Sequence, residues 1–286
     1  MREVKFARYR RYEEARVDAN NSMIALLAGS RLAAHSLQLH EGSPHQLPGL
    51  FPTVRDIDRF NLLPGRATEL LLGADAHLAA VAIPYALAVY EAFVIDAVDL
   101  LEADGKSVDR SRGSTNAGRM HQTFFQAVGS SESNDTIALF HVLRCMRNAQ
   151  IHHAGTVTPE LVSVMSGLTE SQKHRWEKLI MAPIGEVRLG EQIKFTLGHL
   201  IASFAVTKEA ARVLNEVMAE SLSRAFWADQ AVEDYIQGAK KPRNSSGWKR
   251  GLIGSAAFYY RPLQLQEDEL EKAARRNGAW TLDSWS

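Results

Sequence analysis

The residues best suited to chemistry gather between Leu139 and Val157, in the string LFHVLRCMRNAQIHHAGTV. Arg144, Arg147 and Asn148 can bind phosphate oxygens, and His152 can accept or donate a proton near neutral pH. These groups suit phosphate-ester chemistry if they share one site. The competing interpretation is a helix face exposed to water.

A single helix is expected to position these side chains. Ser133-Asn134-Asp135 offers an N-cap followed by an acid in the first turn, and Gly155 is a natural left-handed stop. At about 100° per residue, the helix divides into two arcs. The arc that should face the core holds Leu139, Val142, Leu143, Met146 and Ala149.

The opposite arc mixes polar and large apolar side chains: His141, Arg144, Arg147, Asn148 and His152 with Ile137, Phe140 and Ile151. A solvated face would be richer in Lys and Glu, and a core face would lack arginine. The mixture therefore predicts a contact surface. His153 projects toward Val142 and Met146, which favours packing or a place at the frayed helix end. His152 is the better chemical candidate, although the helix dipole also favours a histidine there.

The whole chain sets limits on the class of protein. It has 286 residues, with 33 basic and 33 acidic side chains, so a phosphate-binding surface must be a local patch. No apolar run approaches the roughly 20 residues that span a bilayer, and the charged N-terminus lacks a signal-peptide core. The single Cys145 excludes an internal disulfide and a multi-cysteine metal site. We expect a cytoplasmic protein without a membrane segment.

Helical patterns dominate, and the expected class is all-α. Helices are predicted over 1–41, 67–103 with a break at Pro84, 119–128, 159–181 and 191–224. A proline-rich linker covers 42–66 and a loop covers 105–118; only AFYYRPLQL near the end has a strand pattern. We expect an N-terminal helical segment with its linker over 1–66, a helical bundle over 67–224 and an extension over 225–286.

The C-terminal extension has a basic and aromatic stretch from Ala239 to Pro262 that contains no acid. Trp248, Phe258, Tyr259 and Tyr260 lie among the cations, a composition that can bind an RNA backbone and stack bases. The alternative is a flexible basic loop whose aromatic residues pack on the body, and basic-aromatic composition alone favours this simpler interpretation. The cations are Lys240, Lys241, Arg243, Lys249, Arg250 and Arg261.

The string from Arg147 to His152, RNAQIH, resembles the signature of the HEPN superfamily, the "higher eukaryotes and prokaryotes nucleotide-binding" domains. That motif is an Arg, usually followed by a polar residue such as Asn, with a His four to six residues after the Arg. The segment YALAVYEAFVIDAVDLL (85–101) resembles an earlier helix of such domains, and 191–224 fits the last bundle helix. The likeness covers roughly 67–224.

The resemblance implies a bundle of four or five helices that forms a homodimer with paired motif helices lining a cleft. It also implies a metal-independent endoribonuclease without a cofactor, often a toxin or antiviral defence effector, with RNA as substrate and a regulatory partner or antitoxin. His152 would be the general acid or base, Arg147 would bind the phosphate, Asn148 would orient either, and Arg144 would add positive field. A catalytically inactive RNA-binding or protein-interaction module is the alternative.

The sequence offers two further candidates. Glu91 can complete the cleft by pairing with Arg147 or polarising His152, but with Asp99 and Glu102 it also fits a solvated stripe on one helix. His141, His152 and His153 are the only histidine cluster, and no carboxylate lies near them in sequence. We therefore expect no metal site.

Overall fold

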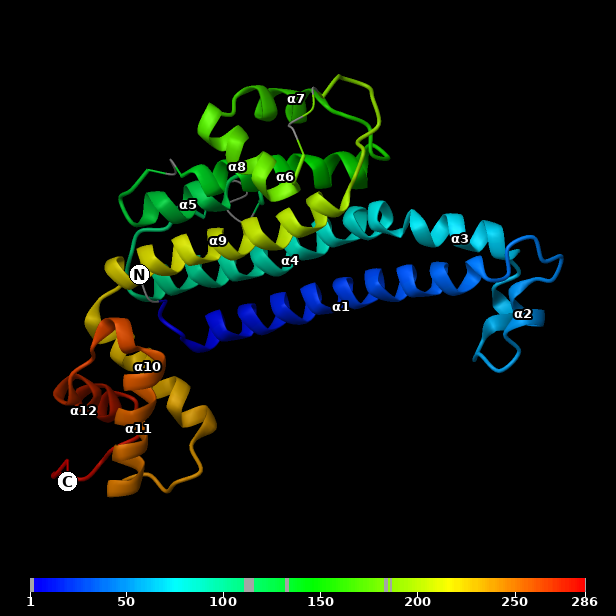
Figure 1. The fold of residues 1–286 in the computed structure, drawn as a ribbon. Coiled ribbons are helices and arrows are strands. Elements are labelled where there is room, and N and C mark those ends of the chain that lie inside the picture. Colours follow the sequence, from blue (N-terminus) through cyan, green and yellow to red (C-terminus); the bar gives the residue numbers. More distant parts are fainter. Residues whose placement is uncertain (1–2, 111–115, 132–133, 183–184, 186, 286) are drawn as a thin grey trace. The chain divides into compact units, whose positions relative to one another are not determined.

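The computed structural model describes residues 3–110, 116–131, 134–182, 185 and 187–285. These residues contain helices and no named strand, so the all-α class is confirmed (Figure 1). The α-helices are α1 (Ala7–Gln38), α2 (Leu47–Leu50), α3 (Pro64–Leu72), α4 (Ala74–Ala103), α5 (Met120–Ala127), α6 (Asp135–His152), α7 (Pro159–Ser166), α8 (Glu170–Ile180), α9 (Leu197–Ser221), α10 (Arg224–Gly238), α11 (Ser246–Tyr259) and α12 (Glu267–Arg276). Two 3-10 turns are η1 (Ile57–Arg59) and η2 (Arg261–Leu263).

Several predicted boundaries shift. The expected helix over 159–181 is two helices, because the chain turns at Gly167 and Thr169 caps α8 by accepting a hydrogen bond from Gln172 N. The long helix expected from residue 191 begins only at Leu197. AFYYRPLQL, the one strand candidate, belongs instead to α11, η2 and the residues that follow.

The predicted break at Pro84 is wrong. Pro84 lies inside α4, and the break falls at Gly73, whose amide donates to Glu69 O at 3.1 Å. An interior proline removes one backbone hydrogen bond, but burial of the flanking residues can keep the helix continuous. Ala82, Ile83, Ala86 and Leu87 are all buried.

The chain forms two compact units, and each is assembled from separate stretches. One contains Met1–Ala15, Ala88–Phe140 and Thr207–Ser286; the other contains Arg16–Leu87 and His141–Val206. Helices α1, α4, α6 and α9 contribute residues to both units. The boundaries expected at 66/67 and 224/225 do not coincide with the limits of these units.

The unit with Arg16–Leu87 and His141–Val206 has a core of small residues. Ala19 of α1 packs with Ala79, Ala82 and Ala86 of α4, and Leu200 and Phe204 of α9 complete the cluster. Alanines let helix backbones approach closely, which explains how three long helices share a narrow core. A second cluster, Leu37, Leu47 and Ala67, holds the turns between α1 and α3.

The other unit has an aromatic core. Phe6 lies 5.4 Å from Trp227 and Tyr12 lies 5.0 Å from Phe93, measured between ring centroids. The Tyr90 hydroxyl and His121 Nε2 are 2.7 Å apart, and both side chains are buried. Burial of several aromatic rings is a large apolar contribution to stability.

The C-terminal extension is folded rather than a flexible loop. Trp248, Leu252, Ala256 and Tyr260 are buried at a spacing of four residues, which marks the inner face of α11. The ring centroid of Trp248 lies 5.3 Å from that of Tyr235 in α10 and 6.2 Å from that of Trp280. α10, α11 and α12 therefore share a tryptophan-rich core.

Among the described residues, α4 is the one helix long and apolar enough to cross a membrane by length and composition. The sequence-based expectation that no segment approaches this length must be corrected for α4. The core helix of a globular protein meets the same criteria, and Ala82, Tyr90 and Val94 of α4 are buried inside the protein.

Candidate functional site

Helix α6 forms as predicted. Asn134 caps it, with its side-chain oxygen accepting from Thr136 N at 2.8 Å, while Ser133 lies outside the described residues. The predicted inner arc, Leu139, Val142, Leu143, Met146 and Ala149, is buried. The opposite arc is less uniform than expected, because Ile137 and Phe140 are also buried whereas Ile151 is 54% exposed.

The end of α6 is fixed by a two-residue left-handed turn. Ala154 has φ of 49° and Gly155 has φ of 80°, and the Gly155 amide donates to Ala149 O at 3.0 Å. This closes the last helical turn as the αL stop predicted at Gly155. The chain reverses directly after His152 and His153.

A short antiparallel pairing then holds the segment after the turn. Val157 N donates to Glu191 O at 2.8 Å, Gly190 N donates to Val157 O at 3.1 Å, and Ile193 N donates to Gly155 O at 2.8 Å. The side-chain amide of Gln192 also donates to Thr156 Oγ1 at 3.0 Å. The walls beside the end of α6 are therefore tied together by backbone hydrogen bonds.

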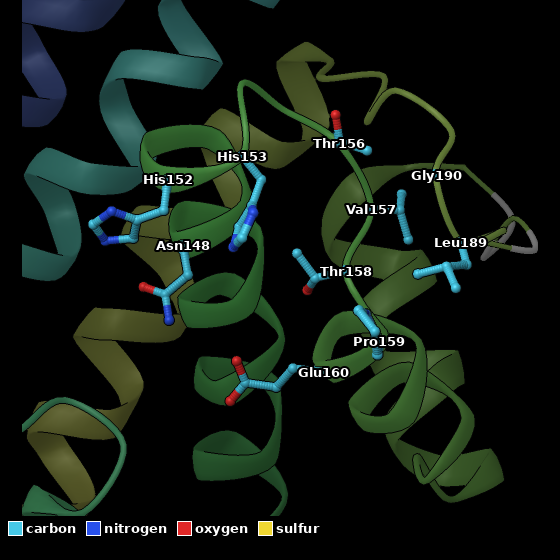
Figure 2. Close-up of a pocket in the computed structure, with 10 residues that line it drawn as sticks. All are labelled: Asn148, His152, His153, Thr156, Val157, Thr158, Pro159, Glu160, Leu189 and Gly190. Atoms are coloured by element: carbon cyan, nitrogen blue, oxygen red, sulfur yellow. The ribbon is translucent and has the colours of Figure 1, made fainter.

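These elements line an open cavity of about 700 Å³. Asn148, His152 and His153 contribute from α6 and its end, the segment from Thr156 to Glu160 forms one wall, and Leu189 and Gly190 form another (Figure 2). Thr158 Oγ1 also accepts from Leu161 N at 3.3 Å and so caps α7. Thr156 to Thr158 connect α6 to α7, whereas Leu189 and Gly190 lie in the non-helical stretch between α8 and α9.

Both histidines line this cavity and both are exposed. His152 and His153 leave the end of α6 on different sides, and His153 faces the segment from Thr156 to Glu160 (Figure 2). Of the two places predicted for His153, the helix end is confirmed and packing against Val142 and Met146 is wrong. The helical wheel misplaced it because α6 stops at His152.

Arg144 is held by neighbours. Its Nη2 donates to Glu160 Oε1 at 2.9 Å, and its Nε donates to His141 Nδ1 at 3.3 Å. The carboxylate of Glu160 balances the guanidinium, so Arg144 could contact a phosphate only by exchanging this partner. Beside it, burial raises the pKa of the Cys145 thiol to about 11, which leaves it a neutral core residue.

The remaining predicted catalytic residues divide between the units. Arg147 is half-buried and lies next to Asn148 on α6, in the unit that contains His152. Glu91 is half-buried on α4 in the other unit. Its pairing with Arg147 stays a prediction.

The predicted phosphate-binding cations of the C-terminal extension fall into two groups, one paired and the other exposed. Lys249 is engaged, with Nζ 2.6 Å from Glu267 Oε1 and 2.6 Å from Trp285 O. Lys240, Lys241, Arg243 and Arg250 are exposed. All of these residues belong to the unit that does not contain His152.

Over the part of the chain that the structure describes, no three His, Cys, Asp or Glu side chains come together as a potential metal site. A further cavity of about 310 Å³ is lined by Met146, Trp176 and His199, among others. Burial lowers the pKa of His199, whose Nδ1 accepts from Thr196 N at 3.2 Å. His199 is therefore a partly buried histidine whose uncharged form is favoured, and sequence reasoning did not single it out.

No family model, no curated protein and no solved structure matches this chain.

Proposed function

We propose that the cavity at the end of α6 is the active site of a metal-independent endoribonuclease of HEPN type that cleaves RNA by attack of its own 2′-hydroxyl. The observation that carries the proposal is the shared cavity: Asn148, His152 and His153 line the same space of about 700 Å³. The motif arginine, Arg147, precedes Asn148 on the same helix.

The chemistry needs one group that accepts a proton and one that donates a proton. In the proposed mechanism His152 takes the proton of the 2′-hydroxyl, and the oxygen then bonds to the adjacent phosphorus. The bond from phosphorus to the 5′-oxygen breaks, and protonated His153 supplies a proton to that oxygen. The products are a 2′,3′-cyclic phosphate and a 5′-hydroxyl.

Charge on the phosphate also has to be stabilised as it develops. Arg147 is the proposed clamp for the phosphate oxygens, because a guanidinium offers paired donors in a fixed plane. Asn148 is the proposed orienting group for a phosphate oxygen or for His152. Arg144 is a weaker candidate because of its bond to Glu160.

Assembly and biology form the outer part of the proposal. Exposed Ile151, on the same helix as Arg147, supports a homodimer in which two copies of α6 meet. A cytoplasmic toxin or antiviral defence effector, held by an antitoxin or another regulatory partner, is the role proposed from the family resemblance. A HEPN-like module that binds RNA or protein without cleaving is the second candidate.

The test is incubation of the purified protein with total cellular RNA in EDTA. We expect fragments with cyclic-phosphate ends from the wild type, a loss of about 100-fold or more in cleavage rate with His152→Ala, and a similar loss with Arg147→Ala. His153→Ala should reduce cleavage and shift its pH profile, because it removes the proposed proton donor.

His174→Ala is the matched control, since His174 is an exposed histidine on α8 that does not line the cavity. It should cleave like the wild type. Equal cleavage by wild type and His152→Ala would overturn the proposed chemistry. RNA binding without cleavage by the wild type would favour the inactive module.

A further inference from the structure

Exposed cations lie on the outer face of α11 and just beyond its C-terminal end, with small residues between them. Arg250, Gly254, Ala257, Phe258 and Arg261 are exposed, opposite the buried stripe of Trp248, Leu252 and Ala256. The helix spans about 21 Å at 1.5 Å per residue. The chain before it adds exposed Lys240, Lys241 and Arg243.

These cations differ from the others of the same three-helix region in having no ion pair among the described residues. Arg224 pairs with Glu269, Lys272 with Asp268, Arg275 with Glu271 and Arg276 with Asp229. Between residues 239 and 262, only Lys249 has such a partner in the described structure. The positive charge of this stretch is therefore available to a ligand.

We propose that this face of α11, with the chain that leads into it, is a docking surface for single-stranded RNA. The RNA backbone would contact Arg243, Arg250 and Arg261, and the ring of Phe258 would stack on a base. Phe258 is 74% exposed and lies edge-on to Tyr259, with ring centroids 4.8 Å apart.

The small residues make a close approach of the backbone feasible. A Cβ atom added at Gly254 would meet no atom within 4 Å, so the space above this residue is open. Ala257 adds only a methyl group. A polyanion can therefore lie along the helix between two arginines, where guanidinium groups bind phosphate in paired geometry.

Single-stranded RNA fits this face better than a membrane. A helix that binds a lipid surface presents several large apolar side chains beside its cations. α11 presents one fully exposed large apolar side chain, Phe258, because Trp248 and Leu252 are buried and Ile253 and Tyr259 are partly buried. One exposed aromatic ring among arginines matches the stacking and backbone contacts of single-stranded nucleic acid.

The choice of RNA rests on the proposed function, and binding is therefore measured separately from cleavage. The ligand is a fluorescent 2′-O-methyl RNA of about 20 nucleotides, which lacks the attacking hydroxyl, and the readout is fluorescence polarisation over a range of salt. The variant is R243Q/R250Q/R261Q of the full chain. The matched control, R55Q/R59Q/R66Q, removes three exposed arginines from the other unit.

We expect the α11 variant to bind roughly 10- to 100-fold more weakly at low salt and to lose about 2 from the slope of log K against log salt. The control variant should bind like the wild type. Phe258→Ala should weaken binding about 5-fold or more, with Phe258→Leu and Phe258→Tyr separating apolar contact from stacking. Both triple variants should unfold at the wild-type midpoint.

Equal loss in the two triple variants would overturn the proposal, since it would reflect net charge alone. So would unchanged binding by the α11 variant, or loss of binding to phosphatidylserine vesicles with RNA binding intact. These results leave the cleavage assay unaffected. Conversely, α11-dependent binding by a wild type that never cleaves RNA would remove the proposed nuclease and keep the docking surface.

Discussion

Replacement of Gly155 by alanine tests whether the turn after α6 holds the cavity wall. Gly155 has φ of 80°, where an L-residue is disfavoured by roughly 1–2 kcal/mol. A Cβ atom there would also lie 3.0 Å from Gln150 Oε1 and 3.2 Å from Gln192 Oε1. Both amides would have to move.

The cost of displacing the glutamine amides can be estimated. Movement of the Gln192 side chain endangers its hydrogen bond to Thr156 Oγ1, which is 3.0 Å long. Such a bond contributes about 0.5–1.5 kcal/mol. Gly155→Ala should therefore lower the free energy of unfolding by about 1.5–3.5 kcal/mol in total.

Gly129 supplies the control. It also has a left-handed φ, of 70°, but an added Cβ would meet nothing within 4 Å. Gly129→Ala should therefore show the conformational part alone, about 1–2 kcal/mol. Urea unfolding followed by circular dichroism measures both variants, with unchanged m-values as the check that the comparison is valid.

The difference between the two variants is the decisive quantity. Equal destabilisation would mean that the amides of Gln150 and Gln192 adjust freely and that the wall is not held by this contact. A neutral Gly155→Ala would refute the reasoning entirely. In the proposed enzyme, Gly155→Ala should also reduce cleavage by moving the wall next to His152 and His153.

Three further predictions concern His199, Cys145 and Gly251. His199 accepts a hydrogen bond and has a lowered pKa, so the imidazole binds a proton less readily in the folded protein than in the unfolded chain. The free energy of unfolding should therefore be unaffected by His199 above about pH 6.5 and should fall below that pH. His199→Gln should reduce this fall, measured as urea midpoints from about pH 7 to 5. Cys145, with its pKa raised to about 11, should react with a thiol reagent at pH 8 roughly 100-fold more slowly than in the unfolded chain, and its burial should reduce stability between about pH 9 and 11. Gly251→Ala should destabilise the protein by about 1–3 kcal/mol, because the new Cβ would lie 1.9 Å from the Tyr235 hydroxyl oxygen, whereas Gly254→Ala on the same helix should be neutral or stabilising.

Each of these has a clear opposite outcome. The same acid slope in wild type and His199→Gln would mean that another group controls acid unfolding. Rapid labelling of native Cys145 would show that α6 opens readily. Equal effects of the two glycine substitutions would contradict the close packing of α10 against α11.

Local signals in the sequence were sufficient for α6. Asn134, the apolar arc and Gly155 specify where the helix begins, which face it buries and where it stops. The prediction failed for His153 because a helical wheel assumes that the helix continues, and φ of 49° at Ala154 ends that assumption. No signal in the residue types alone reveals the cavity wall, since it depends on pairing with residues 190–193.

The helix in the C-terminal extension was not predicted, for a different reason. Its six cations between residues 239 and 262 hid a helical repeat of Trp248, Leu252, Ala256 and Tyr260, which a search for a spacing of four would have found. The predicted break at Pro84 was wrong because helix propensity is a local property, whereas burial on several sides of α4 is a property of the packed chain.

The hydrogen bonds of Val157 with Gly190 and Glu191 have a consequence for how the molecule can vary. The chain leaves this point and returns to it, so α7 and α8 are attached in the manner of an insertion whose two ends meet. Closing a loop of this length costs only roughly 3 kcal/mol, and the cost changes slowly with loop length. Loop closure thus sets only a weak limit on the length of the intervening segment. One set of side chains at the end of α6 can be combined with different neighbouring walls, which is a simple route to new ligand preferences on an unchanged helix.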